Sequence, residues 1–186
     1  MSDWMEKDAV LSARLQIADR PGPLRSIAAI FAHSGDSWFW LLGLGLASRF
    51  GGAAWRARAR ILIGAIFGMA TIVQVLKLLF RRARPVGDWG TVYRQTDPYS
   101  FPSGHASRAG LITGLGTLLG PRWFGLATLI WGPLVALARV AMGVHYISDV
   151  LVGFTLGIGV ASGIASFTRH LIPTEDGDSQ AESEAD

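Results

Sequence analysis

The chain has 186 residues, of which half are hydrophobic and only 17% are charged, and its mean hydropathy is +0.34. This length suits one domain, and the composition indicates a membrane protein rather than a soluble or disordered one. Cysteine is absent, which excludes disulfides and thiolate metal sites. Residues 174–186 carry six acids and no base, so the remaining chain has 17 basic against eight acidic residues, a net +9. In so apolar a chain this excess favours anionic lipid over nucleic acid as a partner.

The first 33 residues are predicted to be an amphipathic N-terminal segment. Between Asp3 and Asp19, apolar Val10, Leu11 and Leu15 alternate with charges, a pattern typical of a helix lying on the membrane surface. The Pro-Gly-Pro sequence at 21–23 is expected to end that helix. The segment lacks a continuous apolar core, so we expect no cleavable signal peptide.

Residues 34–172 are predicted to form an all-α integral membrane helical bundle. Its apolar runs indicate five spans, at 37–55, 61–76 with an extension to Phe80, 106–120, 123–144 and 150–168. Several uncharged runs are shorter than the ~20 residues needed to cross the hydrocarbon core, unless the polar residues beside them are counted. Those polar residues are therefore expected at helix ends. The acidic residues 173–186 are predicted to be a disordered tail.

Three polar clusters interrupt the apolar sequence, and the first is KLLFRRARP at 77–85. Lys77 and Arg84 are seven residues apart, so two turns of a helix would point them the same way, and Pro85 would then stop the helix. Lysine offers phosphate a compact charge and arginine a planar fork. The alternative is a positively charged membrane boundary, and interface anchoring is the favoured role for Arg81 and Arg82.

The second cluster is PSGH, from Pro102 to His105. Ser103 is a predicted N-cap, after which the amides of Gly104 and His105 would face an anion at the positive end of a helix. His105 is suited to protonate a leaving oxygen. An ordinary capped helix with an interfacial histidine is the competing interpretation.

The third cluster, RVAMGVHYISD at 139–149, carries the strongest signal. Arg139 lies deep in an apolar segment, where a partner anion is expected. His145 and Asp149 stand at positions i and i+4, so the carboxylate can fix the imidazole tautomer while the other ring nitrogen attacks phosphorus. Gly143 permits the turn between the spans. A structural His–Asp pair beside a snorkelling arginine is the alternative.

Arg108, His33 and His170 lie outside the three clusters. Arg108 is placed with equal weight in the same cavity as His105 or at the interface, and His33 and His170 are expected to be solvated. The loop at 88–99, which contains Trp89, Tyr93, Arg94 and Asp97, joins the first two clusters and is expected to shape a headgroup pocket.

Taken together, Lys77, Arg84-Pro85, PSGH, Arg139, His145 and Asp149 resemble the signature of the type 2 phosphatidic acid phosphatase superfamily, which includes lipid phosphate phosphatases and vanadium haloperoxidases. The resemblance implies metal-independent hydrolysis through a phosphohistidine, with no cofactor. It makes His145 the nucleophile, Asp149 its orienting partner and His105 the general acid that later activates water. It assigns phosphate binding to Lys77, Arg84, Ser103, Gly104 and Arg139.

This chain departs from the family pattern in two places. Ala138 stands where a serine usually precedes the arginine of the third cluster. Members also commonly have six spans, so either the N-terminal segment is the first family helix or that helix is missing.

The sequence therefore predicts a membrane lipid phosphate phosphatase acting on undecaprenyl pyrophosphate, phosphatidylglycerophosphate or a phosphatidic-acid-like lipid. Two alternatives stay open, a catalytically silent lipid-phosphate-binding or transport protein and a vanadate-dependent haloperoxidase-type enzyme. With five spans, the three clusters and the N-terminus share one face. The arginine-rich loop at 49–60 lies on the opposite face, which predicts that the site faces outward from a bacterial inner membrane.

Overall fold

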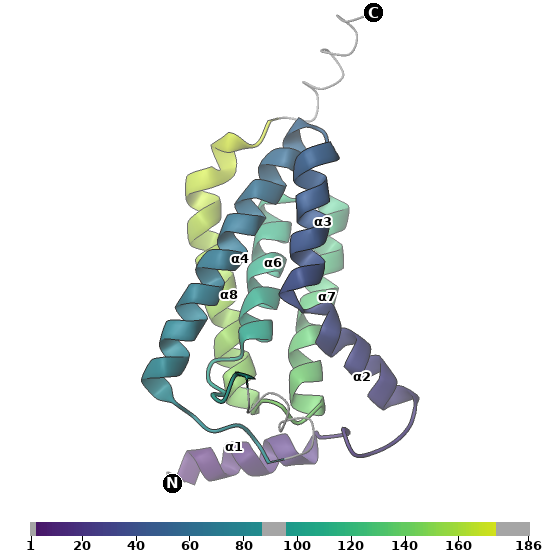
Figure 1. Cartoon of the computed structure of the whole chain (residues 1–186), viewed down its shortest axis with the longest axis vertical. Coiled ribbons are helices and arrows are strands. Elements are labelled where there is room, and N and C mark those ends of the chain that lie inside the picture. Colours follow the sequence, from purple (N-terminus) through teal and green to yellow (C-terminus); the bar gives the residue numbers. More distant parts are fainter. Residues whose placement is uncertain (1–2, 87–95, 174–186) are drawn as a thin grey trace, which may run out of the picture.

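The computed structural model describes residues 3–86 and 96–173. Its body is a bundle of helices that run along its long axis (Figure 1). They are α3 (Ser37–Phe50), α4 (Ala53–Phe80), α6 (Gly104–Leu119), α7 (Arg122–Ala141) and α8 (Ile147–Thr168), which the 3-10 turn η1 (Arg169–Leu171) follows. Each predicted apolar run coincides with one of these helices, so the all-α bundle is confirmed. By length and composition three described segments can cross a membrane, namely Ala53–Phe80, Arg122–Ala141 and Ile147–Leu171.

The N-terminal segment forms two helices instead of one. Helix α1 (Asp3–Arg14) lies across one end of the bundle, and α2 (Pro23–Ser34) slants away from that end toward α3 (Figure 1). Pro23 begins α2, so the predicted break at the Pro-Gly-Pro sequence is confirmed. The apolar side chains of Val10, Leu11 and Leu15 are about half exposed, as a surface-lying helix requires.

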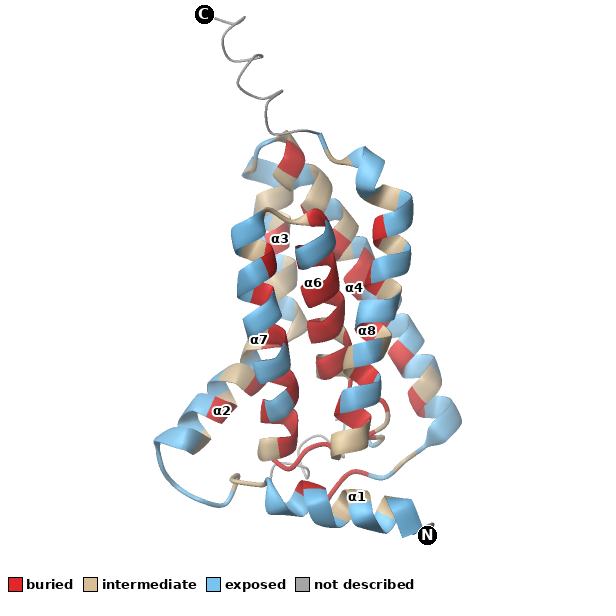
Figure 2. Ribbon diagram, turned by 180° about the vertical axis from the view of Figure 1, so that it is seen from behind, coloured by how far each residue is buried: buried red, intermediate tan, exposed pale blue. Residues whose placement is uncertain are grey.

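Helix α6 is the centre of the bundle and is buried along most of its length (Figure 2). Its most extensive contact is with α8, and glycines make that contact possible. A Cβ atom at Gly110 would lie 2.1 Å from the carbonyl oxygen of Phe154, and one at Gly157 would lie 2.1 Å from that of Ser107. The two helices therefore touch backbone to backbone, and both begin at the same end of the bundle.

The ends of α4 and α7 differ from the prediction. Helix α4 ends at Phe80 rather than at Pro85, because Arg81 adopts the left-handed conformation with φ of 49°. The chain is non-helical beyond it, and Ala83 forms an isolated antiparallel bridge with Tyr99. The two-turn argument for Lys77 and Arg84 was therefore wrong. Helix α7 ends at Ala141, three residues earlier than predicted.

The arginine-rich segment at 49–60 is also mostly helical. Only Gly51 and Gly52 separate α3 from α4, so Arg56, Arg58 and Arg60 lie on the first turns of α4. The loop expected there was wrong, although the arginines do lie at the end of the bundle away from α1. Arg58 donates to the carbonyl of Leu119 at 2.9 Å, which ties this end of α4 to the end of α6.

Candidate active site

The three polar clusters converge at the end of the bundle that α1 covers. There α4, α6, α7 and the turn before α8 enclose a polar cavity of about 180 Å³. Its charged and polar lining is Gln74, Lys77, Arg84, Asp97, His105, Arg108, Arg139 and His145, and Gly104 adds backbone. Four cations and two histidines around one small space suit an oxyanion substrate.

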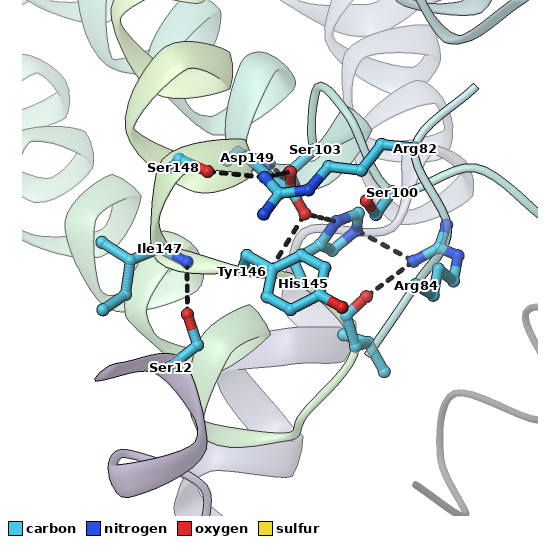
Figure 3. Close-up of polar contacts among 12 residues, drawn as sticks. Ser12, Arg82, Arg84, Ser100, Ser103, His145, Tyr146, Ile147, Ser148 and Asp149 are labelled. Carbon is cyan, nitrogen blue, oxygen red and sulfur yellow. Dashed lines mark hydrogen bonds and ion pairs between the residues drawn. The ribbon is translucent and has the colours of Figure 1, made fainter. Parts of the chain in front are cut away.

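His145 is fully buried in the turn between α7 and α8, where Gly143 takes a φ of 68°. Its Nε2 lies 3.1 Å from Arg84 Nη1, and its Nδ1 lies 3.6 Å from Asp149 Oδ2 (Figure 3). A guanidinium can only donate, so Nε2 accepts and Nδ1 carries the hydrogen that faces Asp149. Burial, followed by the charges of Arg84 and Arg139, holds the pKa of His145 well below its usual range. The imidazole is therefore neutral, with its lone pair on Nε2.

Asp149 is fully buried and is held from two sides. Its Oδ2 accepts the backbone N–H of Tyr146 at 2.9 Å, which caps α8. Its Oδ1 accepts Arg82 Nη1 at 2.7 Å, and Arg82 Nη2 reaches Asp8 Oδ2 on α1, also at 2.7 Å. The anchoring role favoured for Arg82 was wrong, because its side chain is only 10% exposed and bridges two carboxylates.

Helix α1 also braces the start of α8 directly. The backbone N–H of Ser148 donates to Asp8 Oδ1 at 3.2 Å. That of Ile147 donates to Ser12 Oγ at 2.9 Å, the bond drawn in Figure 3. Burial by itself would raise the pKa of Asp8, but hydrogen bonds from Ser148 and Arg82 lower it, so this carboxyl is ionised. Sequence reasoning missed Asp8 and Ser12, whose polar character on an amphipathic helix gave no sign of a buried partner.

The first cluster places two cations on one carboxylate. Lys77, only 3% exposed, and Arg84 both bind Asp97 Oδ2, and the Arg84 distance is 2.8 Å. Arg84 also donates from Nε to the Asp97 carbonyl at 2.7 Å. Asp97 belongs to the loop predicted to shape a headgroup pocket, while the other side chains singled out there, Trp89, Tyr93 and Arg94, lie outside the described residues. Because Lys77 and Arg84 both bind the Asp97 carboxylate, they are positioned to bind one anion together.

The second cluster builds the start of α6 as predicted. Ser103 is fully buried, its Oγ accepts the N–H of Ala106 at 3.4 Å, and its own N–H donates to the Asp149 carbonyl at 3.0 Å. It is the N-cap, and its binding of phosphate stays a prediction. Gly104 and His105 line the cavity.

His105 and Arg108 both contact the break between α2 and α3. His105 Nε2 lies 2.6 Å from Asp36 Oδ1, and Arg108 Nη1 donates to the carbonyl of Gly35. Arg108 therefore faces the same cavity as His105. His33 was expected to be solvated; it is half exposed, but its Nδ1 lies 3.4 Å from Asp36 Oδ2. His170 is exposed, as expected.

A family comparison decides the identity of this arrangement. The sequence profile of the PAP2 superfamily matches residues 58–172, which include all three polar clusters. The chain belongs to the PAP2 superfamily. Its membership and its membrane-spanning helices make it an integral membrane phosphatase.

Sequence similarity to known phosphatases extends over most of the chain. It is 33% identical over 169 residues to decaprenylphosphoryl-5-phosphoribose phosphatase of Mycobacterium tuberculosis, covering 87% of this chain and 89% of the relative. It is 29% identical over 175 residues to lipid A 1-phosphatase of Rhizobium etli, covering 80% and 73%. The fold matches the crystal structure of a transmembrane PAP2-type phosphatidylglycerolphosphate phosphatase from Bacillus subtilis with a TM-score of 0.72. That match has 22% identity and covers 90% of this chain and 87% of the other.

Proposed function

We propose that this PAP2 protein hydrolyses a lipid phosphomonoester or pyrophosphate through a phosphohistidine on His145. The observation that carries the proposal is the buried neutral imidazole, with Nε2 at a cation-lined cavity and Nδ1 facing Asp149. Nε2 attacks phosphorus, the bond to the leaving oxygen breaks, and His105 supplies the proton that this oxygen takes up. Water then attacks phosphorus and gives a proton to His105 as the phosphorus–nitrogen bond breaks. Asp149 stabilises the positive imidazole in between.

The cations are proposed to bind the phosphoryl oxygens. Lys77, Arg84 and Arg139 surround the cavity, and the amides at the start of α6 add donors at Gly104 and His105. The phosphoryl group would replace the Asp97 carboxylate on Lys77 and Arg84. Donors fixed in advance around the developing charge stabilise the transition state without a metal ion, so we expect hydrolysis to continue in EDTA.

An apolar groove beside the cavity supports a lipid as the substrate. It has a volume of about 770 Å³ and is walled mainly by α2, α3 and α7, with Trp40 and Trp131 among its lining. The groove reaches His33 and Ser34, and the next two residues, Gly35 and Asp36, contact Arg108 and His105. An acyl or prenyl chain in the groove would thus place its phosphate in the cavity.

The substrate candidates are undecaprenyl pyrophosphate, phosphatidylglycerophosphate and phosphatidic-acid-like lipids. The name of the Mycobacterium tuberculosis relative adds a phosphorylated prenyl-linked sugar. Purified protein in detergent, assayed for phosphate release from these lipids in EDTA, tests the proposal. One lipid should be hydrolysed, and His145→Ala should not hydrolyse it. Activity of His145→Ala equal to that of the parent excludes the mechanism, and inactivity of the parent on every lipid favours a silent binder. Vanadate should inhibit without conferring halide oxidation.

The site is proposed to face outward from a bacterial inner membrane. Arginines gather at the end of the bundle away from the cavity, and they are Arg49, Arg56, Arg58, Arg60, Arg122 and Arg169. By the positive-inside tendency that end is cytoplasmic. Reporter fusions after the last residue test this orientation, since a C-terminus outside the cytoplasm would reverse it. In this proposal residues 34–172 are the phosphatase domain, and 1–33 brace it through α1. The predicted disordered tail at 173–186 lies outside the described residues apart from Pro173.

A further inference from the structure

We propose that Asp36 is the positioning residue of His105, fixing which ring nitrogen meets the substrate and supporting the protonated imidazole. The inference rests on the proposed function, in which His105 exchanges a proton with the leaving oxygen and then with water. Asp36 comes from the break between α2 and α3, and His105 from the first turn of α6. They are 69 residues apart in sequence and 2.6 Å apart in space.

The bond defines the state of the ring. An ionised carboxylate only accepts, so His105 Nε2 carries the hydrogen that Asp36 Oδ1 receives. Nδ1 is then the nitrogen left to exchange a proton with the reacting oxygen. In the first step His105 is protonated on both nitrogens and gives the Nδ1 proton to the leaving oxygen. In the second step Nδ1 regains a proton from the attacking water, so the cycle returns His105 to its starting state.

Asp36 is itself held in place by the residues before it. Two indole N–H groups fix Ser34: Trp40 Nε1 donates to its carbonyl at 3.1 Å, and Trp131 Nε1 donates to its Oγ at 2.9 Å. The next residue, Gly35, accepts Arg108 through its carbonyl, and a Cβ atom there would lie 3.3 Å from His105 Cδ2. The break between α2 and α3 is thus clamped to α3, α7 and α6. Such fixed geometry is what a group that orients a catalytic ring requires.

The charges around His105 explain why a carboxylate is needed. Arg108 on α6 and Arg139 on α7 both line the cavity and oppose a positive imidazole, while His33 on α2 approaches the other oxygen of Asp36. Asp36 is the carboxylate that contacts the ring among the described residues. Without it, no carboxylate at the ring would offset burial and the charges of Arg139 and Arg108, all of which favour the neutral imidazole.

Asp36→Asn is the most informative variant. Asparagine keeps the shape and is as good an N-cap as aspartate, so α3 should still start normally. With a lipid phosphate as substrate we expect kcat to fall about 10- to 100-fold and KM to change less than about threefold, because only proton transfer is impaired. Asp36→Glu should recover part of the loss, and the exposed-carboxylate control Asp3→Asn should match the parent.

Two further kinetic results separate positioning from a structural role. The double variant Asp36→Asn, His105→Asn should be no slower than His105→Asn alone, since one residue acts through the other. p-Nitrophenyl phosphate releases an anion that needs no proton, so the initial burst of nitrophenolate should be nearly unchanged in Asp36→Asn. An equal fall with both substrates, or additive losses in the double variant, would overturn the proposal.

The ring itself can be observed independently of catalysis. In protein labelled with nitrogen-15 at histidine and held in detergent, NMR should show a strongly hydrogen-bonded Nε2–H for His105. The signal should disappear in His105→Asn, shift upfield in Asp36→Asn and persist in His145→Asn. A signal unmoved in Asp36→Asn refutes the pairing. If the parent hydrolyses no lipid phosphate yet gives this signal, the proposed function fails while the His105–Asp36 pairing stands.

Discussion

The two histidines of the cavity are held in opposite ways. His145 is completely buried, its carboxylate partner Asp149 lies one helical turn away, and the 3.6 Å between them leaves a loose contact. His105 is 17% exposed, and its partner Asp36 lies on a distant segment at a close 2.6 Å. Cations approach both rings, since Arg84 contacts His145 and Arg108 lies one turn beyond His105.

The difference matches the two roles proposed for the rings. A nucleophile must keep a free lone pair, and burial among cations keeps His145 neutral. A proton donor must be able to take up a proton, and the close carboxylate on His105 favours that form against burial and the charge of Arg139, which disfavour it. In the proposed function the same residue type would perform opposite tasks, because one carboxylate is close and the other is shared with Arg82 and the backbone.

Replacing His145 should give the largest effect on this comparison. His145→Ala removes the atom that bonds to phosphorus, so we expect phosphate release to fall at least about 10⁴-fold, as for loss of other enzymatic nucleophiles. His105→Ala should fall less, about 10²- to 10⁴-fold, because it removes only proton transfer. Phosphate release from a phosphatidic acid measures both. If His145→Ala and His105→Ala lose activity equally, and do so with p-nitrophenyl phosphate as well, the division of roles is contradicted.

Replacing Arg82 should affect Asp149 and, through it, His145, without affecting His105. Arg82→Gln leaves the buried Asp149 without its cation, and loss of one partner of a buried pair costs about 3–5 kcal/mol of unfolding free energy. Thermal unfolding in detergent measures the loss, and kcat should fall as His145 loses its orientation. The neighbouring Arg81 is exposed, and its Nε donates to the Leu78 carbonyl, so Arg81→Gln should change stability by less than about 0.5 kcal/mol. Similar losses in both variants would show that charge, rather than the bridge, matters.

The smallest effect is the pH dependence of stability that His145 contributes. An unfolded chain protonates this residue near pH 6.5, whereas the folded protein does so only at lower pH. Below pH 6.5 the unfolded state therefore binds more protons, and the free energy of unfolding falls by at most about 1.4 kcal/mol per pH unit through this group. Comparing thermal unfolding of the parent and His145→Asn between pH 7.5 and 5 isolates the contribution. A stability difference between them that is constant over this range would refute the neutral, buried imidazole.

Sequence reasoning worked best where partners are close along the chain. Asp149 follows His145 by one helical turn, so their spacing was sufficient to predict the pair, and the apolar runs were sufficient to predict the five helices. Asp36 and Asp8 could not be found this way, because each meets its partner only through the packing of distant helices. Lys77 and Arg84 were predicted to lie together, and both do bind Asp97, but the continuous helix given as the reason was wrong. Helix propensities do not predict the left-handed conformation of Arg81.

The glycine contact between α6 and α8 has a consequence for how this site can vary. His105 lies on the first turn of α6, and α8 begins two residues after His145. Since Gly110 and Gly157 join the helices through peptide atoms, no side-chain rotamer at this contact can change the spacing of α6 and α8. Under the proposed function, substitutions in α2 and α3 would reshape the groove for different lipids while the spacing of α6 and α8 stays constant. Tail selection and bond cleavage would then fall to separate parts of one small bundle.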